Sequence, residues 1–117
     1  MPRDIRKYLY DIQQACALLT EFTAGKTFAD YATDAMLRSA VERQFEIIGE
    51  ALNQAVQLDP LLSERIRYSG RIIAFRNRLI HGYASVSDEV VWGVVTAHLP
   101  TLREEIAALV DVSSRGG

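Results

Sequence analysis

The apolar residues of this chain recur every three or four positions along four long stretches, which is the spacing of one face of an α-helix. The first stretch predicts an amphipathic helix that Asp4 caps and that ends near Gly25. The second predicts a long helix over about residues 34–58, and residues 26–32 between the two are expected to be a connection. The stripes consist of Ile5, Leu9, Ile12, Cys16 and Leu19 in the first helix and of Leu37, Val41, Phe45, Ile48, Leu52 and Ala55 in the second.

The middle of the chain carries clear start and stop signals. Asp59 followed by Pro60 is typical of a helix start, and it predicts a short helix that ends near Tyr68, before Ser69-Gly70. The next predicted helix covers about residues 71–83. Its apolar stripe consists of Ile72, Phe75, Leu79 and Tyr83.

The last predicted helix follows a turn over residues 84–86. Ser87 is expected to cap it, and Pro100 inside its apolar pattern predicts a kink. His98 beside the kink is expected to be structural, and residues 113–117 should fray. The stripe of this helix consists of Val91, Val95, Leu99, Leu102, Ile106 and Leu109.

These patterns predict an all-α protein. We expect one domain over residues 1–117, built as an up-and-down bundle of four main helices plus a short helix, because the long stripes can share one core. Gly49 lies inside the long second helix, where glycine costs about 1 kcal/mol relative to alanine. Close packing of another helix against Gly49 would explain its presence. Ala40, Ile47 and Ala51 widen the stripe of that helix, so a second face can meet a partner.

The composition of the 117 residues is that of a globular protein, with 49% apolar and 24% charged residues. The net charge of −2 and the pI of about 5.6 are unusual for a dedicated nucleic-acid binder, which is basic overall. Contact with RNA would therefore need a local cluster of positive charge. The candidates for such a cluster are Arg65, Arg67, Arg71, Arg76 and Arg78.

Two further features narrow the class of protein. The single cysteine, Cys16, excludes an internal disulfide and offers no cysteine cluster for a metal. No apolar run reaches membrane-spanning length, and no signal peptide begins the chain. We expect a cytoplasmic protein that does not associate with a membrane.

The segment from Arg76 to Tyr83 concentrates the residues that can carry chemistry. Arginine binds phosphoryl oxygens bidentately and stays charged, and histidine moves protons near neutral pH. Arg76 and His81 together therefore suggest phosphodiester chemistry on a polyanion. Asn77 and His81 are four residues apart, on one face of a helix, whereas Arg76 and His81 diverge by roughly 140° around the axis.

One helix does not easily aim both Arg76 and His81 at one phosphate. Three solutions remain open: the arginine stem curls round, the helix deforms near Gly82, or a second copy of the helix completes the site. The third makes a homodimer part of the mechanism, because a two-fold axis brings two sets of these residues together.

Each of these residues also has an ordinary structural interpretation. Arg76-Asn77-Arg78 can be a solvated helix face, and a histidine near a helix C-terminus can simply complement the dipole. On the polar side of the long helix, Arg43, Glu46 and Glu50 can form a surface ion-pair face. Alternatively, a carboxylate among them orients Arg76 or His81.

The segment resembles the Arg-x-x-x-x-His-x-Tyr signature of the HepT-like toxins, a branch of the HEPN superfamily, with Arg76, His81 and Tyr83 at the matching positions. Asn77 fills the polar position that commonly follows the arginine. The resemblance covers nearly the whole chain. Glu46-Ile47-Ile48-Gly49-Glu50-Ala51 resembles the second-helix block of the family, and Val91-Trp92 and Leu99-Pro100 resemble its last helix.

The resemblance implies a HEPN-like helical bundle and the toxin of a type VII toxin–antitoxin system, acting as a metal-independent endoribonuclease without a cofactor. Arg76 and His81 would be catalytic: the imidazole would act as general base or acid, and the arginine would stabilise the scissile phosphate. Asn77, Arg78 and Glu50 would support them. Single-stranded RNA would be the substrate.

The resemblance also implies a partner, a cognate minimal nucleotidyltransferase antitoxin that transfers AMP from ATP onto Tyr83. From the residues alone, Tyr83 can equally be a tyrosine at the edge of the core. A second function also stays open, in which the chain is a non-catalytic subunit that binds nucleotide or a nucleotidyltransferase partner. The acidic pI favours that alternative slightly.

Overall fold

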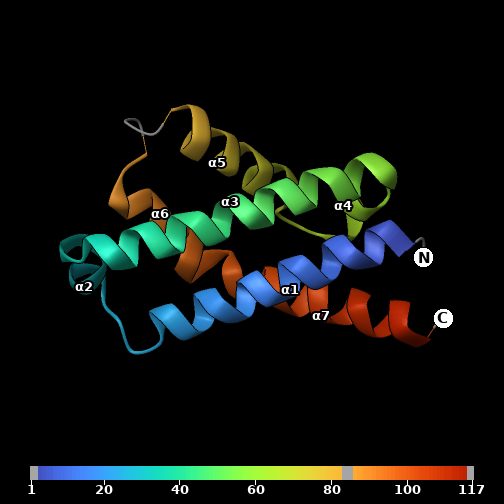
Figure 1. Ribbon diagram of the computed structural model, residues 1–117, viewed down its shortest axis with the longest axis horizontal. Coiled ribbons are helices and arrows are strands. Elements are labelled where there is room, and N and C mark those ends of the chain that lie inside the picture. The colour runs from blue at the N-terminus through green and yellow to red at the C-terminus, as the bar shows by residue number, and fades with distance from the viewer. Residues whose placement is uncertain (1–2, 83–85, 116–117) are drawn as a thin grey trace.

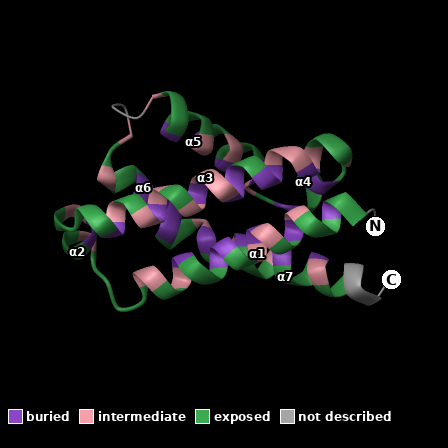
Figure 2. Cartoon of the chain, in the orientation of Figure 1, coloured by how far each residue is buried: buried purple, intermediate pink, exposed green. Residues whose placement is uncertain are grey.

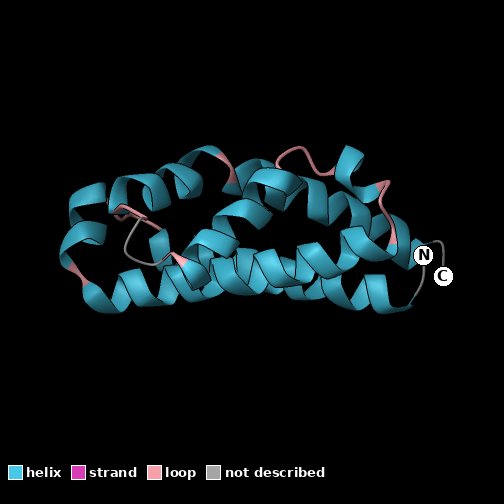
Figure 3. Ribbon diagram, turned by 90° about the horizontal axis from the view of Figure 1, so that it is seen from above, coloured by secondary structure: helices cyan, strands magenta, loops and turns pink. Residues whose placement is uncertain are grey.

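The computed structural model of the chain describes residues 3–82 and 86–115, and it confirms the all-α prediction (Figures 1 and 3). Within these two ranges no helix is both long enough and apolar enough to cross a membrane. The described helices are α1 (Arg3–Thr23), α2 (Phe28–Thr33), α3 (Ala35–Leu58), α4 (Leu62–Arg65), α5 (Ser69–His81), α6 (Asp88–Ala97) and α7 (Leu99–Arg115).

The long helices run in alternating directions, as predicted for an up-and-down bundle. In Figure 1, α1 and α5 run one way along the molecule, whereas α3 and the α6–α7 pair run the other way. The helix α3 packs against α1 on one side and α5 on the other, and α7 packs against α1. Buried and exposed residues alternate along each helix, so that each helix has one buried side (Figure 2).

The predicted connection over residues 26–32 is wrong, because most of it belongs to the short helix α2. Thr27 and Asp30 form a capping box: each side chain accepts a hydrogen bond from the backbone N–H of the other. Six residues are too few to display an apolar stripe, which explains why the periodicity misses this helix. Tyr31 is fully buried, and its ring centroid lies 5.4 Å from that of Trp92 in α6.

The boundaries between α3 and α5 also differ from the prediction. The helix α4 has four residues and ends at Arg65, well before Tyr68. Ser69-Gly70, predicted to be a stop, forms the first turn of α5, because Ser69 is buried and the backbone N–H of Ile72 donates to the carbonyl of Tyr68. The motif helix therefore covers Ser69–His81, two residues earlier than predicted at both ends.

The final helix is interrupted beside Pro100, as predicted, and the interruption divides it into α6 and α7. Ser87 caps α6, and its hydroxyl accepts a hydrogen bond from the N–H of Val90. His98 lies between the two helices and stacks on Tyr68, with ring centroids 4.1 Å apart. The helix α7 continues to Arg115, into the segment predicted to fray.

Candidate active site

The contact between α3 and α5 is closest at Gly49, where the stem of Arg76 lies directly against the backbone of α3. A Cβ atom on Gly49 would lie 2.2 Å from Cβ and 2.5 Å from Cγ of Arg76, closer than real side-chain atoms approach. The predicted close packing at this glycine is confirmed. One helical turn away, Phe75 makes an edge contact with Phe45, with ring centroids 5.3 Å apart. Gly49 and the Phe45–Phe75 contact thus determine where α5 lies along α3 and which face of α5 meets α3.

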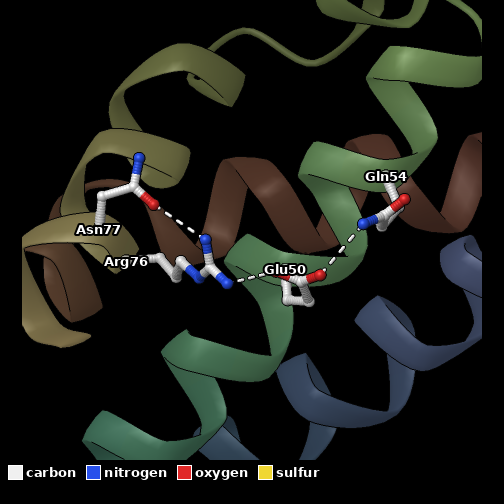
Figure 4. Close-up of polar contacts among 4 residues, drawn as sticks. All are labelled: Glu50, Gln54, Arg76 and Asn77. Carbon is white, nitrogen blue, oxygen red and sulfur yellow. Dashed lines mark hydrogen bonds and ion pairs between the residues drawn. The ribbon is translucent and has the colours of Figure 1, made fainter. Parts of the chain in front are cut away.

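The guanidinium of Arg76 is held from two sides (Figure 4). Its Nη2 forms an ion pair and hydrogen bond with Oε2 of Glu50, and its Nη1 donates to Oδ1 of Asn77 over 2.9 Å. Nε2 of Gln54 donates to the other oxygen of Glu50 over 3.1 Å. The Arg76 side chain is 19% exposed and that of Glu50 is 48% exposed, so the pair adds little to stability but defines the direction of the guanidinium.

The paired guanidinium lies at a groove of about 300 Å³ between α1, α3 and α5. Three acidic and two basic side chains line it among the described residues, so its formal charge is −1. The lining consists of Tyr8, Asp11, Arg43, Glu46, Ile47, Glu50, Ala51, Arg76 and Ile80. In a single copy, this groove does not attract a polyanion by charge alone.

The acidic character of this side of α3 extends toward α6. Burial raises the pKa of Glu42 above its ordinary value, and the carboxylates of Asp88 and Glu46 raise it further, while Arg38 lowers it. Negative charge is therefore already crowded along this part of α3. Adding the negative charge of an RNA strand here needs a compensating cation.

His81 and Arg76 lie on the same helix, as predicted, but they point to different surroundings. Arg76 faces α3 and the groove, whereas His81 is exposed at the last position of α5. The groove beside Arg76 does not include His81 among its described lining residues, and the described hydrogen bonds of Arg76 go to Glu50 and Asn77. Asn77 lies between them in sequence, and its amide oxygen is directed to Arg76. The described contacts of the guanidinium are with Glu50 and Asn77, and they direct it toward α3.

The other predicted site residues are dispersed. Arg78 lines a separate cavity between α5 and α6, together with Arg71, so the arginines expected to form one cluster divide between two flanks of α5. Tyr83 lies outside the described residues. Gln54 was not predicted as a site residue, although its position four residues after Glu50 on a helix was a usable signal.

A metal centre has no obvious place in the described part of the chain, where no group of three or more His, Cys, Asp or Glu side chains is arranged to hold an ion. The positive charge available at the groove is that of Arg76 and Arg43. The arrangement can thus supply a fixed guanidinium and, on the same helix, an exposed imidazole. These are the groups needed for phosphate stabilisation and proton transfer.

Comparison of the sequence with known proteins identifies the family of this chain. The family model described as "Ribonuclease HepT-like" matches residues 12–109. The chain is 34% identical to "Probable ribonuclease HepT" of Thermococcus cleftensis, an alignment that covers 93% of this chain and 98% of the relative. It is 30% identical to "Putative RNase MJ0127" of Methanocaldococcus jannaschii, covering 94% and 91% of the two chains. No solved structure matches the chain.

Proposed function

The chain belongs to the HepT-like ribonuclease family, and on that premise we propose that it is an RNA endonuclease that uses Arg76 and His81 without a metal ion. The observation that carries the proposal is the fixed guanidinium of Arg76, held by Glu50 and Asn77 above the contact at Gly49. A cation that is oriented before substrate arrives stabilises a charged transition state without reorganisation.

The reaction is cleavage by the neighbouring ribose hydroxyl. A base removes the proton of the 2′-OH, the oxygen attacks the adjacent phosphorus, and the bond to the 5′-oxygen of the next nucleotide breaks. An acid returns a proton to that leaving oxygen. The products are a 2′,3′-cyclic phosphate and a 5′-hydroxyl end. His81 serves as the base or the acid, and Arg76 stabilises the negative charge on the phosphoryl oxygens.

A homodimer would complete the site. Arg76 and His81 lie on different sides of α5, and the groove beside Arg76 has a formal charge of −1, so one copy alone presents an unfavourable surface to RNA. A two-fold axis beside α5 would bring the exposed imidazole of one copy toward the guanidinium of the other. The exposed apolar side chain of Ile80 at the groove supports contact with a second copy.

Regulation by an antitoxin is the next part of the proposal. In a type VII toxin–antitoxin system, a minimal nucleotidyltransferase would bring Mg²⁺ and ATP to Tyr83. The phenol oxygen would attack the α-phosphorus, pyrophosphate would leave, and the phenol proton would pass to solvent. The added phosphodiester charge and adenosine would compete with RNA for the arginines of α5. We expect Tyr83→Phe to stay toxic and to gain no adenylate mass when the antitoxin is present.

A non-catalytic role has one observation in its favour. Arg76 is paired with Glu50 in the single copy. In the non-catalytic alternative, the sole role of this ion pair is to maintain the α3–α5 contact. The chain would then be a binding subunit for a nucleotidyltransferase. Harmless expression of the chain alone, together with tight binding of that partner, would favour this second candidate.

The deciding experiment is cleavage of a mixed RNA pool in EDTA by the purified chain. We expect the wild type to cut and to leave cyclic phosphate ends, and His81→Ala and Arg76→Ala to lose activity. The matched control is Arg43→Ala, which removes an arginine of the same groove that no described contact links to Glu50. Equal cleavage by wild type and His81→Ala would contradict the proposal.

A further inference from the structure

The second flank of α5 carries a cavity that the proposed chemistry does not use. It has a volume of about 250 Å³ and lies between α5 and α6. Its walls are apolar, with Ile72 and Phe75 from α5 and Val90 and Val94 from α6. Pockets for drug-sized ligands start at roughly 300 Å³, so this cavity suits a smaller planar group such as one nucleobase.

Positive charge surrounds the mouth of this cavity. Arg71 and Arg78 both line it, and they are seven residues apart on α5, which is two helical turns or about 10 Å along the axis. They therefore lie on one side of the helix, at opposite ends of the cavity. Among the described residues that line it, none is acidic. An anion on either side of an inserted group would meet a guanidinium.

The wall nearest α7 adds aromatic and polar character. His98 lines the cavity and stacks on Tyr68, and the guanidiniums of Arg71 and Arg67 lie 6.0 and 5.5 Å from the Tyr68 ring. Nδ1 of His98 is buried and has no hydrogen-bond partner among the described residues. The wall formed by His98 is an aromatic ring that is itself stacked on a second ring.

We propose that the α5–α6 cavity is a nucleotide subsite that takes one unstacked base of the RNA strand, with Arg71 and Arg78 binding the phosphates on its two sides. The proposal rests on the proposed function for its choice of RNA as the ligand. Single-stranded RNA is usually recognised by unstacked bases in apolar or aromatic sites and by arginine contacts to the backbone. The subsite would hold the strand on the α6 flank of α5, on the other side of that helix from the groove beside Arg76.

The alternative explanation of the same charges is a general attraction for any polyanion. That explanation gives the base no role and makes all exposed arginines equivalent. A nucleotide subsite instead requires both the base and these two arginines. The two explanations are separated by changing the ligand and the protein independently.

The test measures binding of a short, labelled, single-stranded 2′-O-methyl oligonucleotide by fluorescence anisotropy. The blocked 2′-oxygen cannot attack phosphorus, so binding is read without cleavage. An abasic oligonucleotide with the same number of phosphates serves as the second ligand. We expect the wild type to bind the normal oligonucleotide about tenfold more tightly than the abasic one.

Two variants address the two halves of the subsite. The double variant Arg71→Gln, Arg78→Gln should weaken binding about tenfold or more and lower the salt dependence. Its charge-matched control is Arg3→Gln, Arg6→Gln on the exposed face of α1, which should change the affinity by less than about twofold. Ala74→Leu at the rim keeps both arginines but obstructs the cavity, and it should abolish the preference for the oligonucleotide with bases.

Any one of three results would contradict the proposal of a nucleotide subsite. The first is an equal loss of affinity in the α1 control, and the second is an undiminished preference of Ala74→Leu for the oligonucleotide with bases. The third is the absence of that preference in the wild type. Melting curves verify that each variant is folded, and Ala74 is exposed, so its replacement should not disturb the core. A wild type that shows this binding pattern but does not cut RNA would refute the proposed catalysis and leave the subsite standing. Cleavage that depends on His81 in a wild type without the binding pattern would support the proposed catalysis and refute the subsite.

Discussion

The two flanks of α5 hold their arginines in opposite ways. On the α3 flank, Arg76 is clasped by Glu50 and Asn77 in a groove with a formal charge of −1. On the α6 flank, Arg71 and Arg78 border an apolar cavity without an acidic side chain among its described lining residues. Under the two proposals above, the α3 flank fixes a guanidinium for chemistry, and the α6 flank binds the strand.

The two arrangements are efficient for different tasks. A carboxylate beside an arginine reduces its attraction for a distant anion, but it fixes the position that the guanidinium occupies when the anion arrives. The cavity that Arg71 and Arg78 line has no acidic side chain among its described lining residues, so its lining has a formal charge of +2 with His98 neutral. Under the proposed function, RNA would meet the local charge of the α6 flank and not the net charge of −2.

The largest expected effect comes from changing the backbone contact beneath Arg76. Gly49→Ala should destabilise the protein by up to about 2 kcal/mol, because an overpacking cost of about 1–3 kcal/mol opposes a gain of about 1 kcal/mol in helix propensity. Cleavage should fall as well, because the added methyl displaces the stem of Arg76. Thermal melting and cleavage assays measure both effects.

The matched control for that substitution is Gly93→Ala in α6. A Cβ on Gly93 meets nothing within 4 Å, so the same change should stabilise the protein by up to about 1 kcal/mol. The opposite signs separate the close approach of two helices from the ordinary cost of a helical glycine. Stabilisation by both substitutions would show that α5 does not lie against α3 as described.

A smaller effect is expected from the carboxylate that holds Arg76. Glu50→Gln keeps the shape of the side chain but removes its charge, and we expect cleavage to decrease by about tenfold, as for loss of one supporting contact. Glu46→Gln is the control, because Glu46 lines the same groove and no described contact joins it to Arg76. Equal rates for the two variants would mean that Glu50 contributes only charge to the groove.

The smallest effect concerns the crowded carboxylates of α3. The pKa of Glu42 is raised above its ordinary 4.5 in the folded chain, so the folded state binds more protons than the unfolded state between the two values. Stability should therefore fall as pH rises through that window. Glu42→Gln should be more stable than the wild type at neutral pH by a few tenths of a kcal/mol and similar to it below pH 4, in melts across pH. A stability difference that does not change with pH would contradict this origin.

The sequence predicted those parts of the fold that depend on repetition along one element. The long apolar stripes of α1, α3 and α7 are buried as expected. Gly49 in α3 predicts the close approach of another helix, which is α5. The short helix α2 was missed because six residues cannot display a stripe. The start of α5 was misplaced because Ser69-Gly70 is a typical stop, but here it belongs to a helix whose position is set by burial of Ser69.

The sequence proposes residues for the candidate site but does not predict how they are arranged. The family signature named Arg76 and His81, and the polar side of α3 offered Glu50 as one of two open interpretations. Which carboxylate pairs with Arg76 depends on how α5 crosses α3, which no local pattern determines. The division of the arginines between two flanks follows from helix geometry, but a meaning for the α6 flank requires the cavity, which only the packed structure reveals.

The proposed homodimer would combine Arg76 of one copy with His81 of a second copy in one site. The most direct measurement is to mix two inactive variants, Arg76→Ala and His81→Ala, under conditions of proven subunit exchange, and to assay RNA cleavage in EDTA. If the site combines residues of two copies, the mixture should regain about a quarter of the wild-type activity, because half of the dimers are mixed and each has one intact site. A mixture that exchanges fully and stays inactive would contradict the claim.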